Sequence, residues 1–363
     1  MELDGFKASL KDADICSNCG ACMSFCQWDT FERLNPGHRG EPAICRSCMV
    51  CFRICPRPQS RYAQNEEAIF GAARSNELLG YYREAVAAKA VQPPAGAQDG
   101  GATTALLKFI LREGLVEAAL LTRRDSVWQP QPFLATTETE VDEAAGSKYT
   151  AAPALSILRQ ALERFSRIAF VGVPCQIAAL RNLQQRREAA YPADRVVLAI
   201  GLFCAESFTY GRPETHGMAH FVQEELGMPL DRVTRFDIKK NNLMVYEAER
   251  VEGRPLSEIK HLAWPICHAC PDFTGELADL SIGAVGSAAD QSTILVRSAL
   301  GQEMLERAAA AGFLEIAPVR NLGIVERIAQ NKRTRRAELS PDAAQFLTKR
   351  SIRGNYKKAA VLD

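Results

Sequence analysis

The sequence predicts a mixed α/β fold (α/β or α+β) that follows a short cysteine-rich module at the N-terminus. Two observations lead to this prediction. Eight of the twelve cysteines fall within the first 55 residues, and after them apolar runs of strand length alternate with segments of helical periodicity. With 363 residues, 47% of them apolar and 24% charged, the chain is long enough for two or three domains with a sizeable buried core.

The first element is a pair of cysteine runs, each spaced C-x2-C-x2-C-x3-C as in bacterial ferredoxins. In that arrangement the fourth cysteine of one run binds the cluster held by the other run. We therefore predict two [4Fe–4S] clusters, one held by Cys16, Cys19, Cys22 and Cys55 and the other by Cys45, Cys48, Cys51 and Cys26. Structural zinc or disulfides are the alternative, although zinc gains nothing from a third cysteine two residues further on.

Proline and glycine punctuation divides the rest of the chain. Residues 1–60 form the predicted ferredoxin-type module, and residues 61–90 a linker with helix over 64–90. Residues 91–340 form a mixed-sheet core, and residues 341–363 a C-terminal tail. Within the core, helices are predicted over 102–113, 156–165, 176–189, 302–311 and 323–333. Strands are predicted over 118–122, 168–173, 196–203, 280–285 and 294–296, with a hairpin joining 233–238 to 243–249 at Asn241-Asn242.

The remaining four cysteines are scattered through this core. Cys175 and Cys204 each follow a predicted strand, and Cys267 and Cys270 form a C-x2-C pair. Neighbouring strand ends of a parallel sheet open at one edge, where sites form, so these four thiols could hold a third cluster. From spacing alone, buried structural cysteines are an equal alternative.

Two loops are candidates for a phosphate-bearing cofactor. Gln98-Asp99-Gly100-Gly101 leads into Ala102, Thr103 and Thr104 at a helix start, where backbone N–H groups favour phosphate. Gly146-Ser147-Lys148-Tyr149 places a cation and an aromatic ring beside a flexible turn. Each loop alone also fits an ordinary capped turn. No G-x-G-x-x-G follows a strand, which argues against a Rossmann nicotinamide site.

Charge and hydropathy restrict the partners. Lys and Arg total 44 against 43 Asp and Glu, so we predict no nucleic-acid partner. No apolar run is long enough for a membrane span and no secretory signal begins the chain, so a cytoplasmic protein is expected. The basic residues Lys332, Arg333, Arg335 and Arg336 are expected to form a solvated face or, less often, a docking surface. Lys148 and the Lys239-Lys240 pair are candidates for holding phosphate or carboxylate groups, although an exposed, solvated position is the favoured interpretation for the pair.

Taken in order, several of these segments resemble the family of coenzyme F420 hydrogenase/dehydrogenase beta subunits over about residues 80 to 335. The segments are Gln98–Gly101, Gly146–Tyr149, Gly172–Gln176, Leu202–Cys204 and Cys267–Phe273. The resemblance implies FAD, bound by Gln98 to Thr104 and by Ser147, Lys148 and Tyr149. It also implies a third [4Fe–4S] cluster on Cys175, Cys204, Cys267 and Cys270, so that three clusters use all twelve cysteines.

The function implied is that of an oxidoreductase subunit. FAD would exchange a hydride with coenzyme F420 or another hydride carrier, and the clusters would pass single electrons to or from other redox subunits or ferredoxin. Two alternatives stay open: a stand-alone reductase of an organic substrate that uses ferredoxin, and an electron-transfer subunit without its own substrate. Ala284 supports the latter, because the family often has an acidic residue there. No catalytic side chain is assigned.

Overall fold

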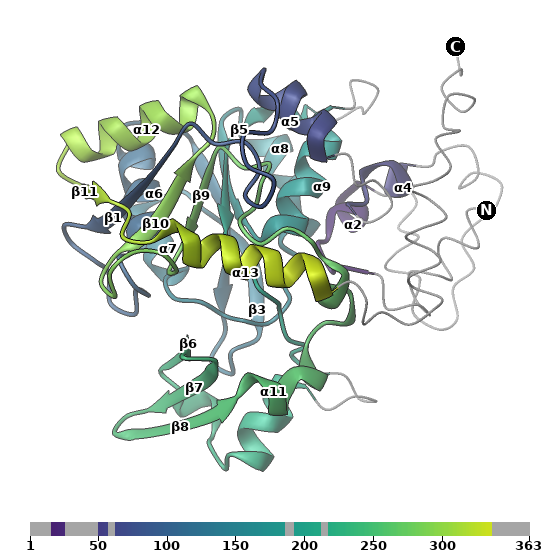
Figure 1. Ribbon diagram of the computed structural model, residues 1–363, viewed down its shortest axis with the longest axis vertical. Helices are drawn as coiled ribbons and strands as arrows, with labels where there is room; N and C mark the ends of the chain where they lie inside the picture. Colours follow the sequence, from purple (N-terminus) through teal and green to yellow (C-terminus); the bar gives the residue numbers. More distant parts are fainter. Residues whose placement is uncertain (1–15, 26–49, 57–61, 186–191, 212–216, 336–363) are drawn as a thin grey trace.

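The computed structural model describes residues 16–25, 50–56, 62–185, 192–211 and 217–335. Its centre is an eight-stranded mixed sheet (Figure 1). The strands are β1 (Glu84–Ala90), β2 (Ala118–Arg124), β3 (Pro130–Ala135), β4 (Ile168–Gly172), β5 (Val196–Leu202), β9 (Leu280–Gly283), β10 (Ser292–Val296) and β11 (Leu314–Pro318). Their order across the sheet is β11-β1-β10-β9-β5-β4-β2-β3. The four strands β9, β5, β4 and β2 are parallel, and the flanking pairs are antiparallel.

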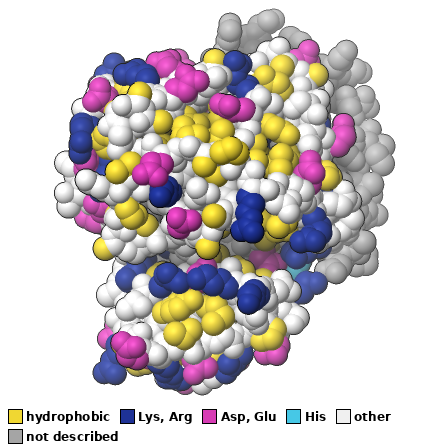
Figure 2. Space-filling model, turned by 60° about the vertical axis from the view of Figure 1, so that its left-hand side comes forward, with side chains coloured by type: hydrophobic (Ala, Val, Ile, Leu, Met, Phe, Trp, Pro, Cys, Tyr) yellow, Lys and Arg dark blue, Asp and Glu magenta, His cyan; other side chains and the backbone are white. Residues whose placement is uncertain are grey.

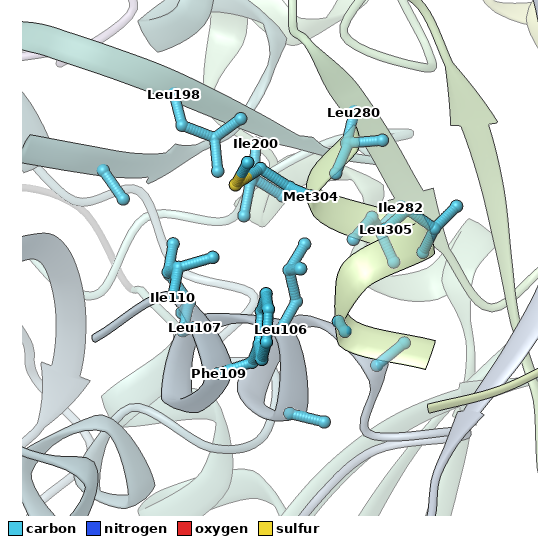
Figure 3. Packing of buried hydrophobic residues seen from close by; sticks show 14 of the residues in the cluster. Leu106, Leu107, Phe109, Ile110, Leu198, Ile200, Leu280, Ile282, Met304 and Leu305 are labelled. Carbon is cyan, nitrogen blue, oxygen red and sulfur yellow. The ribbon is translucent and has the colours of Figure 1, made fainter. Parts of the chain in front are cut away.

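Helices cover both faces of this sheet, because each contributes one apolar stripe to a buried core. One core includes residues of α6 (Ala102–Arg112), α7 (Glu138–Glu143) and α12 (Ala299–Ala310), packed on Leu198 and Ile200 of β5 and on neighbouring strands (Figure 3). The other core includes residues of α8 (Leu158–Arg164) and α9 (Pro174–Gln184), packed on Leu120 and Phe170. Full burial of a leucine or isoleucine side chain contributes about 1.5–3 kcal/mol, so these two cores hold the sheet in place.

A second, three-stranded sheet forms a smaller lobe below the main sheet in Figure 1. Its strands are β6 (Arg235–Lys239), β7 (Asn242–Glu247) and β8 (Arg250–Pro255), and the short helices α10 (Met218–His220) and α11 (Leu256–Ile259) accompany them. The hairpin between β6 and β7 turns through Lys240 and Asn241, both with positive φ, as a two-residue hairpin turn requires. Trp128, in the loop between β2 and β3, fixes the lobe by donating to the Val233 carbonyl at 2.8 Å.

Most of the predicted core elements are confirmed, including the Asn241 hairpin and the helices near residues 102, 302 and 323. The helix expected over 64–90 is wrong beyond Phe70. Helix α5 (Tyr62–Phe70) ends there, and Glu84–Ala90 is strand β1 between β10 and β11. The alanine-rich sequence of β1 favours a helix locally, but pairing on both sides in the sheet decides its structure.

Two further cysteine-bearing segments, α2 (Ala21–Phe25) and α4 (Val50–Ile54), lie beside α9 (Figure 1). Helix α13 (Leu322–Thr334) crosses the front of the molecule in Figure 1 and packs through Val325 and Ala329. Within the described residues, every helix is too short or too polar to cross a bilayer.

Candidate functional site

Two of the scattered cysteines lie at neighbouring strand ends, as the sequence predicts. Strands β4 and β5 are parallel partners. Cys175 is the second residue of α9, which begins just after β4, and Cys204 lies two residues after β5. The carboxyl ends of adjacent parallel strands meet at one edge, so the topology brings both residues to the same side of the sheet.

The C-x2-C pair reaches this edge from a distant part of the chain, and Ser207 contacts two of the thiols there. The Ser207 amide donates to the Cys267 sulfur at 3.5 Å, and its hydroxyl lies 3.8 Å from the Cys204 sulfur. Cys267 lies in the 3₁₀ turn Pro265–Ala269, and Cys270 follows that turn in a buried position. The Cys204 amide donates to the Phe273 carbonyl at 2.8 Å, which holds the two segments together.

These three thiols share a buried electrostatic environment. Burial, followed by the nearby Cys204 thiol, raises the pKa of Cys267 to about 12. Burial also raises the pKa of Cys204, although the nearby Lys332 ammonium opposes this rise. Thiols that resist ionisation alone become favourable ligands once a metal centre supplies positive charge, so a donor set of Cys204, Cys267 and Cys270 fits an iron–sulfur cluster. Among the described residues, no three Cys, His, Asp or Glu side chains already form a metal-binding geometry.

The buried ammonium of Lys332 adjoins the same thiols. Lys332 lies on α13, is 3% exposed and donates to the Cys204 carbonyl. Burial opposes its charge, but the negative charge that Cys270, Cys204 and Cys267 carry as thiolates outweighs burial and raises its pKa. The expectation of a solvated face is therefore wrong for Lys332. Its helical neighbour Arg333 is also engaged, through an ion pair of 2.6 Å with Glu276.

The N-terminal cysteines form a second group of sulfurs. The structure describes nine of the twelve cysteines, all as thiols, whereas Cys26, Cys45 and Cys48 lie outside the described residues. Burial raises the pKa of Cys22 well above its ordinary value, and nearby thiols add to this effect. Those neighbours are Cys19, Cys55, Cys16 and Cys51. The structure thus brings Cys55 of the second run to the first three cysteines of the first run, together with Cys51.

This N-terminal segment is docked on the body by its backbone. The Leu155 amide donates to the Cys19 carbonyl at 2.9 Å, and the Arg159 amide donates to the Ser24 hydroxyl at 2.7 Å. Gly20 has a φ of +83°, and a Cβ there would lie 2.6 Å from the Pro153 carbonyl oxygen. Close backbone approach therefore requires glycine at this position.

A tryptophan joins the two sulfur groups. The indole N–H of Trp264 donates to the Cys16 carbonyl across 248 positions of sequence. Trp264 also precedes the turn that carries Cys267, and the Cys267 amide donates to the Trp264 carbonyl at 2.8 Å. Trp264 therefore links the backbone of Cys16 to that of Cys267.

The two candidate cofactor loops also come together, around the side chain of Gln98. Its carbonyl oxygen accepts from the Ser147 amide at 2.9 Å, and its amide nitrogen lies 2.9 Å from both the Tyr149 hydroxyl and the Asp237 carboxylate. Burial, followed by Asp237, raises the pKa of both Tyr149 and Asp99. Asp237 of β6 thereby ties the small lobe to both loops.

Glycines shape the approach to helix α6. Gly100 is packed against backbone, since a Cβ there would lie 2.5 Å from the Ala88 carbonyl oxygen. Gly101 caps α6 with a φ of 64° and provides no side-chain hydrogen bond to the first turn, which holds Thr103 and Thr104. The donor groups at this helix start fit a phosphate group, whose charge the helix dipole also favours.

Lys148 is held by backbone carbonyls at the end of α7. Its ammonium donates to the Ala144 and Gly146 carbonyls at 2.5 and 2.9 Å. Burial, followed by repulsion from Arg124, lowers its pKa to about 7. Figure 2 shows further Lys and Arg side chains along the border of the small lobe with the body. On that lobe Arg235 and Lys239 form ion pairs with Asp237 at 3.2 and 2.9 Å. Lys239 is exposed, as expected, but it has an acidic partner.

Sequence reasoning missed three residues of these sites: Lys332, Trp264 and Asp237. The basic run around Lys332 hides one buried residue among exposed neighbours, although helical spacing from Val325 and Ala329 places it on the same buried face. Trp264 adjoins the C-x2-C segment, and an aromatic residue beside metal-type cysteines is the only signal for it. Asp237 lies 139 positions from its partner Gln98, and nothing local marks that contact.

A mixed α/β body with buried thiols at the ends of its parallel strands, beside a cysteine-rich N-terminal segment, is typical of proteins with thiolate-bound redox centres. Comparison with known families makes the assignment specific. Models of the coenzyme F420 hydrogenase/dehydrogenase beta subunit match residues 85–159 (N-terminal part) and 165–321 (C-terminal part). The chain belongs to this family.

Individual relatives agree with this assignment. The chain is 34% identical to the beta subunit of coenzyme F420 hydrogenase of Methanothermobacter thermautotrophicus over 271 residues, which cover 70% of this chain and 93% of the relative. It is 28% identical to a subunit of the F(420)H(2) dehydrogenase of Methanosarcina mazei over 338 residues, 90% of this chain and 91% of the relative. A solved chain of the F420-reducing [NiFe] hydrogenase complex from Methanosarcina barkeri superposes with a TM-score of 0.68 at 30% identity. It covers 72% of this chain and 92% of the solved one.

Proposed function

We propose that this chain is an F420-linked oxidoreductase subunit that holds FAD and three [4Fe–4S] clusters. It would exchange a hydride with coenzyme F420 or a similar carrier and pass single electrons to or from a partner subunit or ferredoxin. Family membership supports the coarser part, since relatives of this chain carry F420-linked names. The cofactors and the hydride step are our inference from the cysteine spacing together with the family resemblance.

One observation carries the proposal: the Trp264 indole contacts the Cys16 carbonyl, and the Cys267 amide donates back to the Trp264 carbonyl. The N-terminal cysteines around Cys16 and the group of Cys204, Cys267 and Cys270 are therefore neighbours, and each group is spaced as cluster ligands are. Cysteine used only as a small core residue gives no reason for such pairing of two groups. Centres that exchange single electrons need this proximity.

The chain's own residues have definable tasks at the flavin end. Bound FAD would supply the exchange between two-electron and one-electron chemistry. Gln98 holds the two loops and β6 in one arrangement, so Ser147 and Tyr149 keep their positions without a ligand. The first amides of α6 and the Lys148 ammonium are the groups that would bind the pyrophosphate.

The test is an anaerobic assay of the full chain with cofactor analysis. We expect about twelve irons and about one FAD per chain. We also expect the protein to reduce a dye with reduced F420 much faster than with NADH or NADPH. Fewer than about eight irons, or no FAD, would contradict the proposal.

The same assay separates the alternatives. Full cofactor content with no dye reduction by any of the three hydride donors would identify an electron-transfer subunit without its own substrate. Reduction of an organic double bond by a stable monomer supplied only with reduced ferredoxin would identify a stand-alone reductase.

A further inference from the structure

The residue that raises a new question is Lys332. A lysine ammonium with 3% of its surface exposed is costly, because loss of hydration costs several kcal/mol unless opposite charge compensates it. Among the described residues its hydrogen-bond partner is the Cys204 carbonyl, a neutral acceptor. The compensation must therefore come from charges close by that are not directly hydrogen-bonded to it.

The groups around the ammonium identify that compensation. The neighbours that favour its charge are the thiols of Cys270, Cys204 and Cys267, followed by the carboxylate of Asp272. Asp272 is 1% exposed, and its carboxylate is already engaged by the amides of Gly275, at 2.7 Å, and Glu276. Protonated thiols are neutral and compensate nothing, whereas thiolates bound to an iron–sulfur cluster carry negative charge that remains after the irons are counted.

Helix α13 does not depend on this lysine for its position. Val325 and Ala329 are fully buried on the same helix, and Arg333 holds it through Glu276 at 2.6 Å and the Leu78 carbonyl at 3.3 Å. An anchor at Lys332 is therefore redundant for folding, while its charge lies where the thiols gather. A structural lysine would be better placed beside a carboxylate at the surface.

We propose that Lys332 is a positioning residue for the cluster at Cys204, Cys267 and Cys270: its hydrogen bond fixes the Cys204 turn, and its fixed positive charge raises the reduction potential of that cluster. The inference rests on the proposed function, since it requires a cluster at these cysteines. Reduction adds one electron and no proton to the cluster. A nearby buried cation stabilises the more negative product and makes the cluster easier to reduce.

The experiment is a potentiometric titration of the full-length protein, with dithionite as reductant and EPR as the readout. The variants are Lys332→Met, which removes the charge and the hydrogen bond, and Lys332→Gln, which removes the charge but keeps a neutral N–H donor on a shorter side chain. Lys332→Arg keeps the charge. Arg327→Met is the matched control, because it removes one positive charge from an exposed position of the same helix.

We expect one of the three EPR signals to shift in the Met and Gln variants. At the wild-type midpoint, the ratio of reduced to oxidised cluster should fall at least tenfold, which corresponds to about 59 mV toward negative potential. The other two signals should stay in place. Lys332→Arg and Arg327→Met should keep all three midpoints near wild type.

The other outcomes are also decisive. Unchanged midpoints in both neutral variants, or an equal shift in Arg327→Met, would overturn the role of Lys332. If both neutral variants lose about four irons while Lys332→Arg keeps them, the charge is needed to hold the cluster, which supports the same assignment. Loss of iron in all three Lys332 variants would overturn it. Wild-type protein without a third cluster would instead refute the proposed function.

Discussion

Two lysines in this molecule have opposite electrostatic environments. Lys332 lies beside Cys204, Cys267 and Cys270, and as thiolates these neighbours raise its pKa in spite of burial. Lys148 belongs to the Gly146–Tyr149 loop, where burial and Arg124 lower its pKa to about 7. Both ammonium groups donate to backbone carbonyls. The difference is that acidic groups surround the first lysine, while among the described residues no acidic group favours the charge of the second.

This difference shows how the two sites depend on what they bind. The thiols that favour the Lys332 charge belong to the chain, so that site needs only metal to become complete. At Lys148 the missing negative charge must come from outside, and the phosphates of FAD would provide it. The comparison therefore predicts that ligand binding changes the charge state of Lys148 far more than that of Lys332.

The largest expected effect concerns Cys175, the proposed fourth ligand of the cluster near Lys332. Cys175 lies at the first turn of α9, where the helix dipole favours a thiolate. We expect Cys175→Ser to lose about four of about twelve irons, measured by iron analysis of anaerobically purified protein. Ser207→Ala keeps the backbone donor to Cys267 and should retain its iron. Full iron content in Cys175→Ser would mean that the three thiols near Lys332 recruit their fourth ligand elsewhere.

The next largest effect is expected where the N-terminal cysteine segment docks on the body of the protein. In Gly20→Ala the new Cβ would lie 2.6 Å from the Pro153 oxygen at a φ of +83°. We expect a loss of about 2–4 kcal/mol in the free energy of unfolding, from strain and forced backbone movement. The measurement is an anaerobic urea titration.

Gly71→Ala provides the control for this effect. Gly71 has a similar φ of +65°, but nothing lies within 4 Å of its Cβ position. That variant should lose only about 1–2 kcal/mol. Equal losses of unfolding free energy in the two variants would show that the close contact between residue 20 and Pro153 contributes no cost beyond the positive φ.

On the Lys148 side, the corresponding test is Gln98→Leu. The change leaves the Ser147 amide and the Asp237 carboxylate without their shared partner. Unsatisfied buried groups cost about 1–3 kcal/mol, so we expect FAD affinity to fall at least several-fold, measured by fluorescence titration of the apoprotein. Iron content should remain that of wild type. Unchanged FAD affinity would separate Gln98 from the flavin site.

The cysteine sites can be predicted from the sequence more fully than the cofactor loops around Gln98 and Lys148, for a physical reason. Thiolate ligation needs cysteine, so the spacing of Cys16, Cys19 and Cys22 is visible in the sequence, and strand ends locate Cys175 and Cys204. Lys332 could not be predicted, because burial of one basic residue in a basic run depends on the face that α13 turns toward the core.

The proposed flavin site depends on backbone groups and on contacts between distant residues, which give weaker signals in the sequence. The glycines before α6 indicate a turn, but only the fold brings Gln98 to Asp237. In the same way, β1 carries a helix-favouring sequence and becomes a strand through its two neighbours. Strand β3, which the sequence analysis missed, contains Pro130 and Pro132 and is tolerated because it lies at the edge of the sheet.

The smallest expected effect is the part of the pH dependence of stability that Lys148 contributes. Its folded-state pKa is about 7, below the value of about 10.4 expected in the unfolded chain. Between these values the unfolded chain binds a proton that the folded chain has released, so the free energy of unfolding should rise with pH. We expect a rise of up to about 1 kcal/mol per pH unit above pH 7 in the apoprotein.

Lys148→Met should remove this rise, because methionine has no proton to exchange. Saturating FAD should also flatten it in wild-type protein if a phosphate group lies beside the ammonium, since the negative charge raises the pKa of Lys148 in the folded state. Urea titrations at several pH values, with and without FAD, measure both effects. Parallel pH profiles for wild type and Lys148→Met would mean that this lysine keeps its proton without an acidic partner, and the contrast with Lys332 would disappear.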